Sequence, residues 1–400
     1  PTLTHSLHLF LPDGFPHSVT PDYLPFQAWD SLQAASSYLR GIMATQALLE
    51  SVGVGTASAS PLAAALTWVM RDGASMLGSL AFVAWGASRF ALNVRFYRLF
   101  ADVANDVGLT LNMVSPLLPK PLFLPVACLA SLCMGLCGVV AGSTRAVITT
   151  HFARSNNIAD VASKESSQET AVTLLGMLLG LFISSFDLSK GQAWVFFLLL
   201  TAFHVYANWR AVSVLRFRTL NASRADVAMR TWLSTNKVPA LEAVNEEEPL
   251  LPWAPWSPPL PRLRHTGRRV FLQFGCGAVA FGRCVAAGTR NLAAVMDEYE
   301  GEEYLAAACA HGGDCTIAIG LKRGVTVRGR LQAYLQAVLT RQGVAAGQDD
   351  VAAVLREARR RSAAQMDAFL AALEGQGYDV EGSEVGGTTG WRLNFRVVGN

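Results

Sequence analysis

The sequence predicts a mainly α-helical protein, in which a six-helix hydrophobic bundle, expected to lie in a membrane, precedes a small α+β C-terminal domain. Three observations support this fold class. They are long uncharged runs in the first half, an uneven distribution of charge, and a change of residue pattern after a proline-rich stretch. Charged residues make up 16% of the chain and hydrophobic residues 51%, whereas a soluble domain usually carries about 25% charged residues.

The charge deficit is concentrated in the first half of the chain. Residues 1–209 hold 10 Lys and Arg and 11 Asp and Glu, whereas residues 210–400 hold 23 and 19. A membrane-embedded half followed by a soluble half is the simplest explanation of this contrast.

Six long helices are expected in the charge-poor half. We place them near residues 27–52, 57–90, 97–118, 121–150, 166–187 and 191–218. A membrane span needs about 20 mostly apolar residues. The uncharged runs 51–70, 123–144 and 191–209 contain 20, 22 and 19 residues. These lengths favour membrane helices over the buried helices of a large soluble bundle.

Small residues are frequent in these runs. Gly138 and Gly142 form one pair spaced by four residues, and Gly176 and Gly180 form another. Such pairs allow membrane helices to approach closely, although they are weak signals in a chain rich in glycine and alanine.

Loop charge gives a separate indication of membrane topology. If the six helices cross alternately, one side receives nine basic residues and the other receives two. This is the asymmetry that the positive-inside rule describes. The nine are Arg89, Arg95, Arg98, Arg145, Arg154, Lys164, Arg210, Arg216 and Arg218, and the two are Lys120 and Lys190.

A proline-rich linker is expected between two domains. Residues 236–266 contain seven prolines and an acidic triplet. The domains then span residues 1–235 and 267–400. Patterns in the second domain predict strands at 268–277, 314–321, 378–382 and 391–398, and helices at 296–310, 327–341 and 349–377.

Several function classes are not indicated. The net charge of +3 is small for a nucleic-acid-binding protein. The seven cysteines form no CxxC pair, so no metal site is expected. No catalytic or nucleotide-binding motif occurs, so we expect neither an enzyme nor a cofactor.

Charges inside the predicted helices mark a candidate polar cavity or gate. Arg71 and Asp72 interrupt an apolar helix, where an ionisable pair usually faces a partner or a water-filled path. The alternative is a short turn between two shorter helices. Asp102 and Asp106 lie four residues apart and share a helix face. Two interpretations stay open: this face meets Arg71 or Arg145, or it is the solvated end of the helix.

A polar island, residues 151–170, separates two strongly apolar runs. It places Arg154, Asp160 and Lys164 on the basic side of the bundle, where we expect a loop that gates the bundle or docks a partner. Its end carries a capping box, because Ser166 is followed three residues later by a glutamate, so a helix is expected to begin there.

Several segments together resemble the ROOT UV-B SENSITIVE (RUS) family. They are "FLPDGFPHSVTPDYLPFQAWDSLQA", "LTWVMRDGASMLG", "RLFADVANDVG", "GVVAGSTRAVITTHFARSNNIADVASKESSQETAVTLLG" and "LAALEGQGYDVEG". They occur in the same order and cover nearly the whole chain, with the proline-rich linker as the main departure.

The resemblance implies a role in UV-B response, early development and vitamin B6 homeostasis, with a link to auxin transport. It implies membrane lipid and a paralogous RUS-family protein as partners, and the plastid as one candidate compartment. It supplies no catalytic residues. Because the chain begins at Pro1 rather than Met, we expect residues before it, and a targeting segment stays an open question.

Two main hypotheses follow. The leading one is a non-enzymatic membrane protein that acts as a carrier-like or adaptor bundle. The alternative is a soluble helical scaffold that forms a heterodimer with a paralogue, and it requires a polar outer surface on the bundle. An enzyme of vitamin B6 metabolism is a third, less supported hypothesis.

Overall fold

The computed structural model describes residues 8–52, 61–90, 92–186, 188–250, 270–288, 291–311 and 314–386. Contacts divide the chain into two compact units, Pro1–Leu215 and Arg216–Asn400. Each unit is described separately below.

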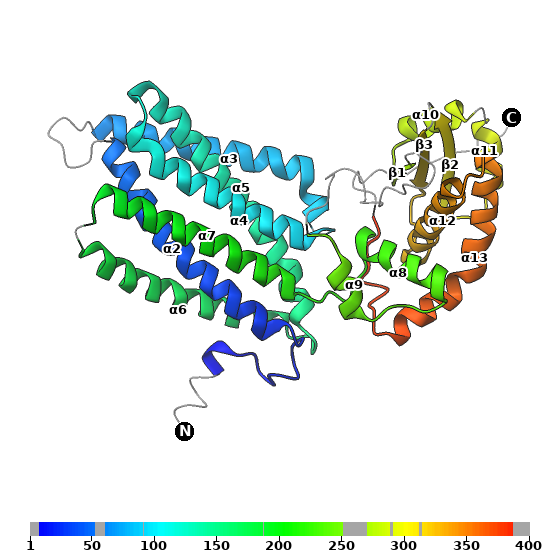
Figure 1. Ribbon diagram of the computed structural model, residues 1–400, viewed down its shortest axis with the longest axis horizontal. Helices are drawn as coiled ribbons and strands as arrows, with labels where there is room; N and C mark the ends of the chain where they lie inside the picture. The colour runs from blue at the N-terminus through cyan, green and yellow to red at the C-terminus, as the bar shows by residue number, and fades with distance from the viewer. Residues whose placement is uncertain are drawn as a thin grey trace. The chain divides into compact units, whose positions relative to one another are not determined.

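Six long α-helices form the described part of the first unit, which confirms the predicted bundle (Figure 1). They are α2 (Tyr23–Val52), α3 (Pro61–Phe90), α4 (Val94–Val114), α5 (Lys120–Phe152), α6 (Ile158–Ser184) and α7 (Lys190–Val214). A single 3-10 turn, η1 (Ser115–Leu117), connects α4 to α5, because prolines at its start and just after it interrupt the α-helical hydrogen bonds.

The two helices with the most polar interior faces lie at the centre of the bundle. Helix α2 packs against α4, α6 and α7, and α4 packs against α2, α5 and α7, whereas α3 packs mainly against α5. Figure 1 shows α2 passing between α6 and α7. This arrangement surrounds the charges of α2 and α4 with more apolar helices.

The outer surface of the bundle is apolar. Among the described residues, α5, α6 and α7 are each long and apolar enough to cross a membrane, by length and composition. Many large apolar side chains of the bundle are exposed instead of buried. They include Met76, Leu77 and Leu80 on α3, Leu174, Leu175, Leu178, Leu181 and Phe182 on α6, and Val195, Leu198 and Leu199 on α7.

The predicted start of the fifth helix is wrong. Helix α6 begins at Ile158, with Asn157 before it, so Ser166 lies inside the helix and not at its N-cap. The residues around Ser166 would allow a helix to begin there. The turns of α6 before Ser166 are nevertheless helical, because Asp160 and Lys164 contact the N-terminal segment and stabilise them. A capping box does occur at Ser189, whose side chain accepts a hydrogen bond from the N–H of Gln192 at the start of α7.

Helix α3 continues through Arg71 and Asp72 without a break. The alternative of a short turn between two shorter helices is therefore wrong, and this pair lies inside a continuous helix. Gly73 lies inside the same helix, and a Cβ added to it would meet no atom within 4 Å.

The second unit is a small α+β fold, as predicted. Three strands, β1 (Val270–Phe274), β2 (Tyr304–His311) and β3 (Asp314–Leu321), form a sheet in the order β1-β3-β2. Strand β1 is parallel to β3, and β2 is antiparallel to β3. The helices are α8 (Ala222–Thr235), α9 (Leu241–Glu247), α10 (Ala278–Ala287), α11 (Leu292–Glu298), α12 (Val327–Ala345) and α13 (Val351–Gly375).

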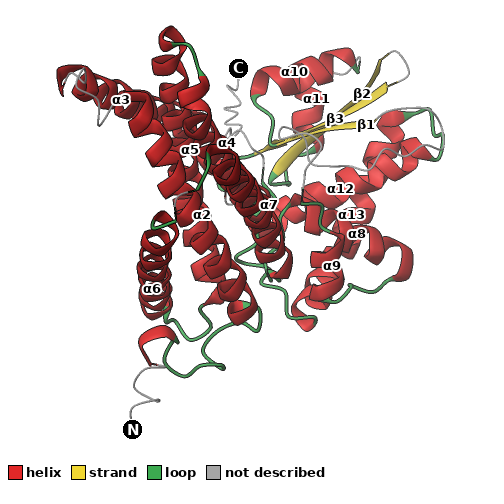
Figure 2. Ribbon diagram, turned by 60° about the vertical axis from the view of Figure 1, so that its left-hand side comes forward, coloured by secondary structure: helices red, strands yellow, loops and turns green. Residues whose placement is uncertain are grey.

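Helices cover both faces of this sheet. Figure 2 shows α10 and α11 on one side and α12 and α13 on the other. Most of the central strand β3 is buried, and its residues belong to one continuous hydrophobic core with Tyr304, Tyr334 and Phe369. This burial on both faces explains why β3 is a nearly uninterrupted apolar run.

Some predictions for the second half differ from the structure. Residues 296–310 were predicted as one helix, but α11 ends at Glu298 and the alanine-rich remainder is strand β2, because it pairs with β3 along its whole length. Residues 378–382 form a turn with one isolated bridge at Asp379. The predicted strand at 391–398 lies outside the described residues.

The segment predicted as a linker is partly helical. It begins after α8 and includes α9, whose Asn245 is buried and hydrogen bonds to the backbone of Phe217. Its remainder beyond residue 250 lies outside the described residues. Helix α8 belongs to the second compact unit, since its apolar face joins the core of that unit.

Candidate functional site

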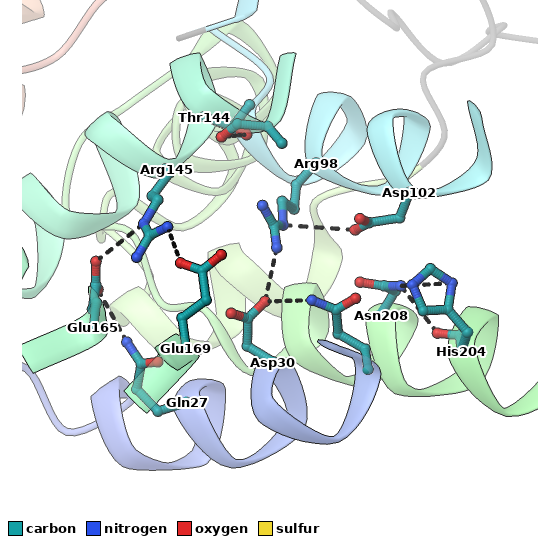
Figure 3. A network of polar contacts seen from close by, with 12 residues as sticks. Gln27, Asp30, Arg98, Asp102, Thr144, Arg145, Glu165, Glu169, His204 and Asn208 are labelled. Atoms are coloured by element: carbon teal, nitrogen blue, oxygen red, sulfur yellow. Dashed lines mark hydrogen bonds and ion pairs between the residues drawn. The ribbon is translucent and has the colours of Figure 1, made fainter. Parts of the chain in front are cut away.

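A cavity of about 620 Å³ lies inside the helical unit, between α2, α4, α5 and α6. Its lining combines polar side chains with apolar ones such as Phe26, Leu109 and Ile148. The charged residues of the lining, all drawn in Figure 3, are Asp30, Arg98, Asp102, Arg145, Glu165 and Glu169.

The first charged group joins α2 to α4. Arg98 Nη2 donates a hydrogen bond to Asp30 Oδ1 over 2.8 Å, and Gln33 Nε2 donates to the same oxygen over 3.2 Å. The Nε atom of Arg98 lies 3.6 Å from Asp102 Oδ2, one turn further along α4. The guanidinium of Arg98 therefore lies between two carboxylates (Figure 3).

The second charged group joins α5 to α6. Arg145 Nη1 donates to Glu169 Oε2 over 2.6 Å, and its Nε lies 3.8 Å from Glu165 Oε2. Glu165 is buried and also accepts hydrogen bonds from Gln27 Nε2 (3.0 Å) and Thr149 Oγ1 (2.7 Å). The guanidinium of Arg145, like that of Arg98, lies between two carboxylates.

A third, fully enclosed group lies beside the cavity and joins three helices. Arg40 on α2 donates from Nη1 to Asp106 Oδ1 on α4, and His204 Nδ1 on α7 lies 2.8 Å from the same oxygen. Asn208, one turn along α7, donates to the backbone oxygen of His204 over 3.0 Å. All four side chains are buried, so this cluster fixes the relative positions of α2, α4 and α7.

Two acceptor atoms of the cavity lining have no hydrogen-bond donor. Oδ2 of Asp102 accepts no hydrogen bond, although only 7% of the residue is exposed, and Oε1 of Gln168 accepts none either. A buried acceptor without a donor costs free energy, typically about 1–3 kcal/mol. Both atoms are themselves covered by neighbouring atoms, and Asp102 Oδ2 is the oxygen that lies 3.6 Å from Arg98 Nε, so it is held by the ion pair with Arg98.

The two glycine pairs have different environments. A Cβ added at Gly138 or Gly142 on α5 would meet no atom within 4 Å, and both glycines line the cavity. A Cβ added at Gly176 on α6 would lie 2.9 Å from the ring of Tyr38, and one at Gly180 would clash with Ile42, both on α2. The first pair thus keeps the cavity open, whereas the second allows α6 to pack closely on α2.

The structure brings together three of the predicted site residues. Asp102 and Arg145 line the cavity, and Asp106 belongs to the enclosed cluster beside it. Arg71 does not line the cavity. It is buried on α3, with its guanidinium 4.4 Å from the ring centre of Trp68, whereas its neighbour Asp72 is exposed.

The three predicted residues of the polar island lie outside the cavity, beside the N-terminal strap, which we define as residues 8–22. Asp160 Oδ2 accepts a hydrogen bond from the N–H of Asp13 over 2.8 Å, and Lys164 Nζ donates to the backbone oxygen of His8 over 2.6 Å. The side chain of Arg154 is exposed, and its N–H donates to Ser18.

The strap also reaches the cavity lining. Gln168 Nε2 donates to the backbone oxygen of Phe10 over 2.6 Å and lies 3.2 Å from the hydroxyl oxygen of Tyr23. Since Gln168 lines the cavity, the polar island connects the strap to the cavity.

Several residues of the site were not identified as such from the sequence. Asp30, Arg40, Glu165 and His204 were not singled out, and Arg98 was considered only as a loop charge. Arg40 and His204 carried a usable signal, because each is an ionisable residue within an otherwise apolar helical stretch. Asp30 and Glu165 lie near helix ends, where charges are common and carry little information.

No metal-binding cluster is present in the part of the chain that the structure describes. The lining of the cavity supplies carboxylates, guanidinium groups, amides, hydroxyls and the thiol of Cys137. These groups bind and orient a polar molecule through hydrogen bonds and charge.

Comparison with known proteins identifies the family. Residues 2–236 match the model of the vitamin B6 photo-protection and homoeostasis domain. The chain belongs to the RUS family. It is 44% identical over 250 residues to root UVB sensitive 3 of Arabidopsis thaliana, covering 62% of this chain and 57% of that protein.

Further RUS relatives match over similar lengths. RUS family member 1 of Dictyostelium discoideum is 43% identical over 220 residues, covering 54% of this chain and 42% of that protein. The chloroplastic root UVB sensitive 2 of Arabidopsis thaliana is 31% identical over 246 residues, covering 61% of this chain and 56% of that protein. The chain thus spans about half the length of these relatives. No solved structure matches it.

Proposed function

We propose that the helical unit is a membrane-embedded, carrier-like bundle whose polar cavity binds a small molecule in vitamin B6 homeostasis and UV-B response. The observation that carries this proposal is the combination of an apolar outer surface with a charged interior cavity. Soluble proteins rarely expose large continuous apolar surfaces, and membrane bundles turn ionisable residues inward or toward water-filled space.

The distribution of basic residues supports one orientation of the bundle in the membrane. Arg145 and Glu169, on the cavity lining, have side chains that are 42% and 59% exposed, so the cavity opens near the C-terminal end of α5. The same end carries most of the loop arginines and lysines that the sequence places on one side. By the positive-inside rule, the opening faces the compartment from which the protein is inserted.

The soluble scaffold is less well supported. It requires a polar outer surface, whereas the exposed faces of α6 and α7 are rich in large apolar side chains. Pairing with a paralogue stays a prediction, as does the absence of enzymatic activity. The exposed apolar face of α3 is compatible with either lipid or a second chain.

Filling the cavity tests the proposal. Gly142→Leu in the full-length protein should abolish rescue of a plant line that lacks its RUS relative, while the protein reaches the membrane at normal levels. Gly191→Leu is the matched control, because this glycine also has no atom near its Cβ position but lies outside the cavity lining. Full rescue by Gly142→Leu would contradict a role for the cavity.

A further inference from the structure

We propose that the cavity is selective for small organic cations, with a positively charged nitrogen held near Asp102. This inference rests on the proposed function, since it assigns a ligand class to the same cavity. It follows from the charge balance, the carboxylate acceptors and the aromatic side chains of the lining.

The lining has more negative than positive groups. Arg98 and Arg145 are the two cationic side chains of the lining, while Asp30, Asp102, Glu165 and Glu169 are the four acidic ones. Each guanidinium already lies between two carboxylates. With all six groups ionised, the lining carries two uncompensated negative charges.

The enclosed cluster beside the cavity contributes at most one further positive charge, because the guanidinium of Arg40 and the imidazole of His204 share the single carboxylate of Asp106. The lining therefore keeps an excess of negative charge. Glu169 is largely exposed, but the carboxylates of Asp102 and Glu165 are buried. An uncompensated buried charge is costly in a membrane protein, so a bound cation or protons complete the balance.

The four carboxylates of the lining are hydrogen-bond acceptors. An ammonium group brings three donors and no acceptor, so it suits these carboxylates, whereas a carboxylate or phosphate would bring only acceptors. An anion would also have to separate Arg98 or Arg145 from the carboxylates that already hold them.

Aromatic side chains in the lining also favour a cationic ligand. Phe26 and Tyr38 line the same cavity, and ring faces attract cations within about 6 Å. Apolar neighbours such as Val172 leave space for a hydrocarbon or ring portion of the ligand. The site therefore suits a compact molecule with one cationic nitrogen and an apolar body.

Cys137 provides a built-in probe, since it lines the cavity beside Gly138 and its side chain is partly exposed. Purified full-length protein is treated with a cationic methanethiosulfonate (trimethylammonium-ethyl) or an anionic one (sulfonatoethyl). Labelling of Cys137 is followed by peptide mass spectrometry. Each labelling rate is divided by the rate at which the same reagent reacts with free mercaptoethanol. This division corrects for the difference in intrinsic reactivity between the two reagents.

We expect the corrected rate of the cationic reagent to exceed that of the anionic reagent by at least about tenfold. Asp102→Asn should reduce this ratio about fivefold, as expected for the loss of one nearby charge. A ratio near one, or in favour of the anion, would overturn cation selectivity but leave the carrier proposal standing.

The same assay tests ligand binding. Benzylamine should slow the labelling of Cys137, and benzyl alcohol, which has nearly the same shape without the charge, should not. Equal protection by both compounds would overturn the proposal. Labelling is also measured at the cysteine introduced by Gly142→Cys. If neither reagent labels that cysteine or Cys137, the cavity is closed, and the carrier proposal fails together with this one.

Discussion

The Nδ1 atom of His204 on α7 lies 2.8 Å from Oδ1 of Asp106 on α4, and both side chains are buried. The same carboxylate oxygen accepts a hydrogen bond from Arg40 on α2, whose side chain is fully buried. One carboxylate thus connects three helices of the bundle, so its removal should affect stability and not only local geometry.

Asp106→Ala should strongly destabilise the helical unit. The substitution leaves the guanidinium of Arg40 buried without its carboxylate, a change that typically costs about 3–5 kcal/mol. Thermal unfolding of the purified protein in detergent measures this loss. Glu169→Ala is the control, since it breaks a largely exposed ion pair with Arg145 and should cost at most about 1 kcal/mol. Equal effects of the two substitutions would contradict the enclosed cluster.

The same substitution should destabilise the protein in one glycine pair and leave its stability nearly unchanged in the other. Gly180→Leu forces a side chain against Ile42 and should destabilise the contact between α6 and α2, by about 1–3 kcal/mol. Gly142→Leu enters the cavity and should leave the melting temperature nearly unchanged. Both variants are compared by thermal unfolding in the same detergent. A larger loss for Gly142→Leu would mean that the cavity is already filled.

Asp160→Ala should loosen the N-terminal strap without unfolding the bundle. It removes the acceptor of the Asp13 N–H, a hydrogen bond worth about 1 kcal/mol, which corresponds to about a fivefold increase in the opened state. Limited proteolysis at residues 8–22 reports this opening. In the control variant Arg154→Ala, the strap should be cleaved at the wild-type rate, because Arg154 contacts the strap through its backbone N–H, which the substitution keeps. Identical cleavage of Asp160→Ala and wild type would refute the role of this carboxylate.

Cys276 in the second unit should react slowly with iodoacetamide in the native protein. Burial raises the pKa of this thiol to about 11, above its usual value of 9.0. The thiol is therefore mostly protonated at neutral pH, and its alkylation rate should rise about tenfold per pH unit until the pH approaches that pKa. Peptide mass spectrometry after timed alkylation measures the rate. In the structure the N–H of Cys276 donates to the backbone oxygen of Ile319 on β3 over 3.0 Å, and the thiol is buried. Rapid labelling at neutral pH, before any unfolding, would contradict this burial.

The bundle could be predicted from the sequence because its signal is strong and local. The uncharged run at 123–144 is long enough to fix α5, and the charge-poor first half indicates an apolar exterior. Predictions failed where distant contacts decide the local structure. Ser166 carries a valid capping pattern, yet α6 begins at Ile158, where Asp160 and Lys164 contact the strap. Residues 304–311 have helix-forming alanines, yet they pair with β3.

The site was predictable only in part. Asp102 and Arg145 were identified because charges stand out near apolar helices, but their partners Asp30 and Glu165 look like ordinary helix-end residues. The helix crossing angles and close approaches that bring these carboxylates together do not appear in any local pattern. Arg71 was predicted to belong to the site because it is a charge in the middle of an apolar helix. It lies apart from the cavity, against the ring of Trp68.

Alkaline carbonate extraction of membranes that contain the full-length protein tests the central claim most directly. The helical unit exposes large apolar side chains on α6 and α7 and has three helices, among the described residues, that are long and apolar enough to cross a bilayer. The protein should therefore remain in the membrane pellet after carbonate treatment and enter the supernatant only with detergent. Its release by carbonate as a soluble species would contradict the membrane-embedded bundle and favour the soluble scaffold.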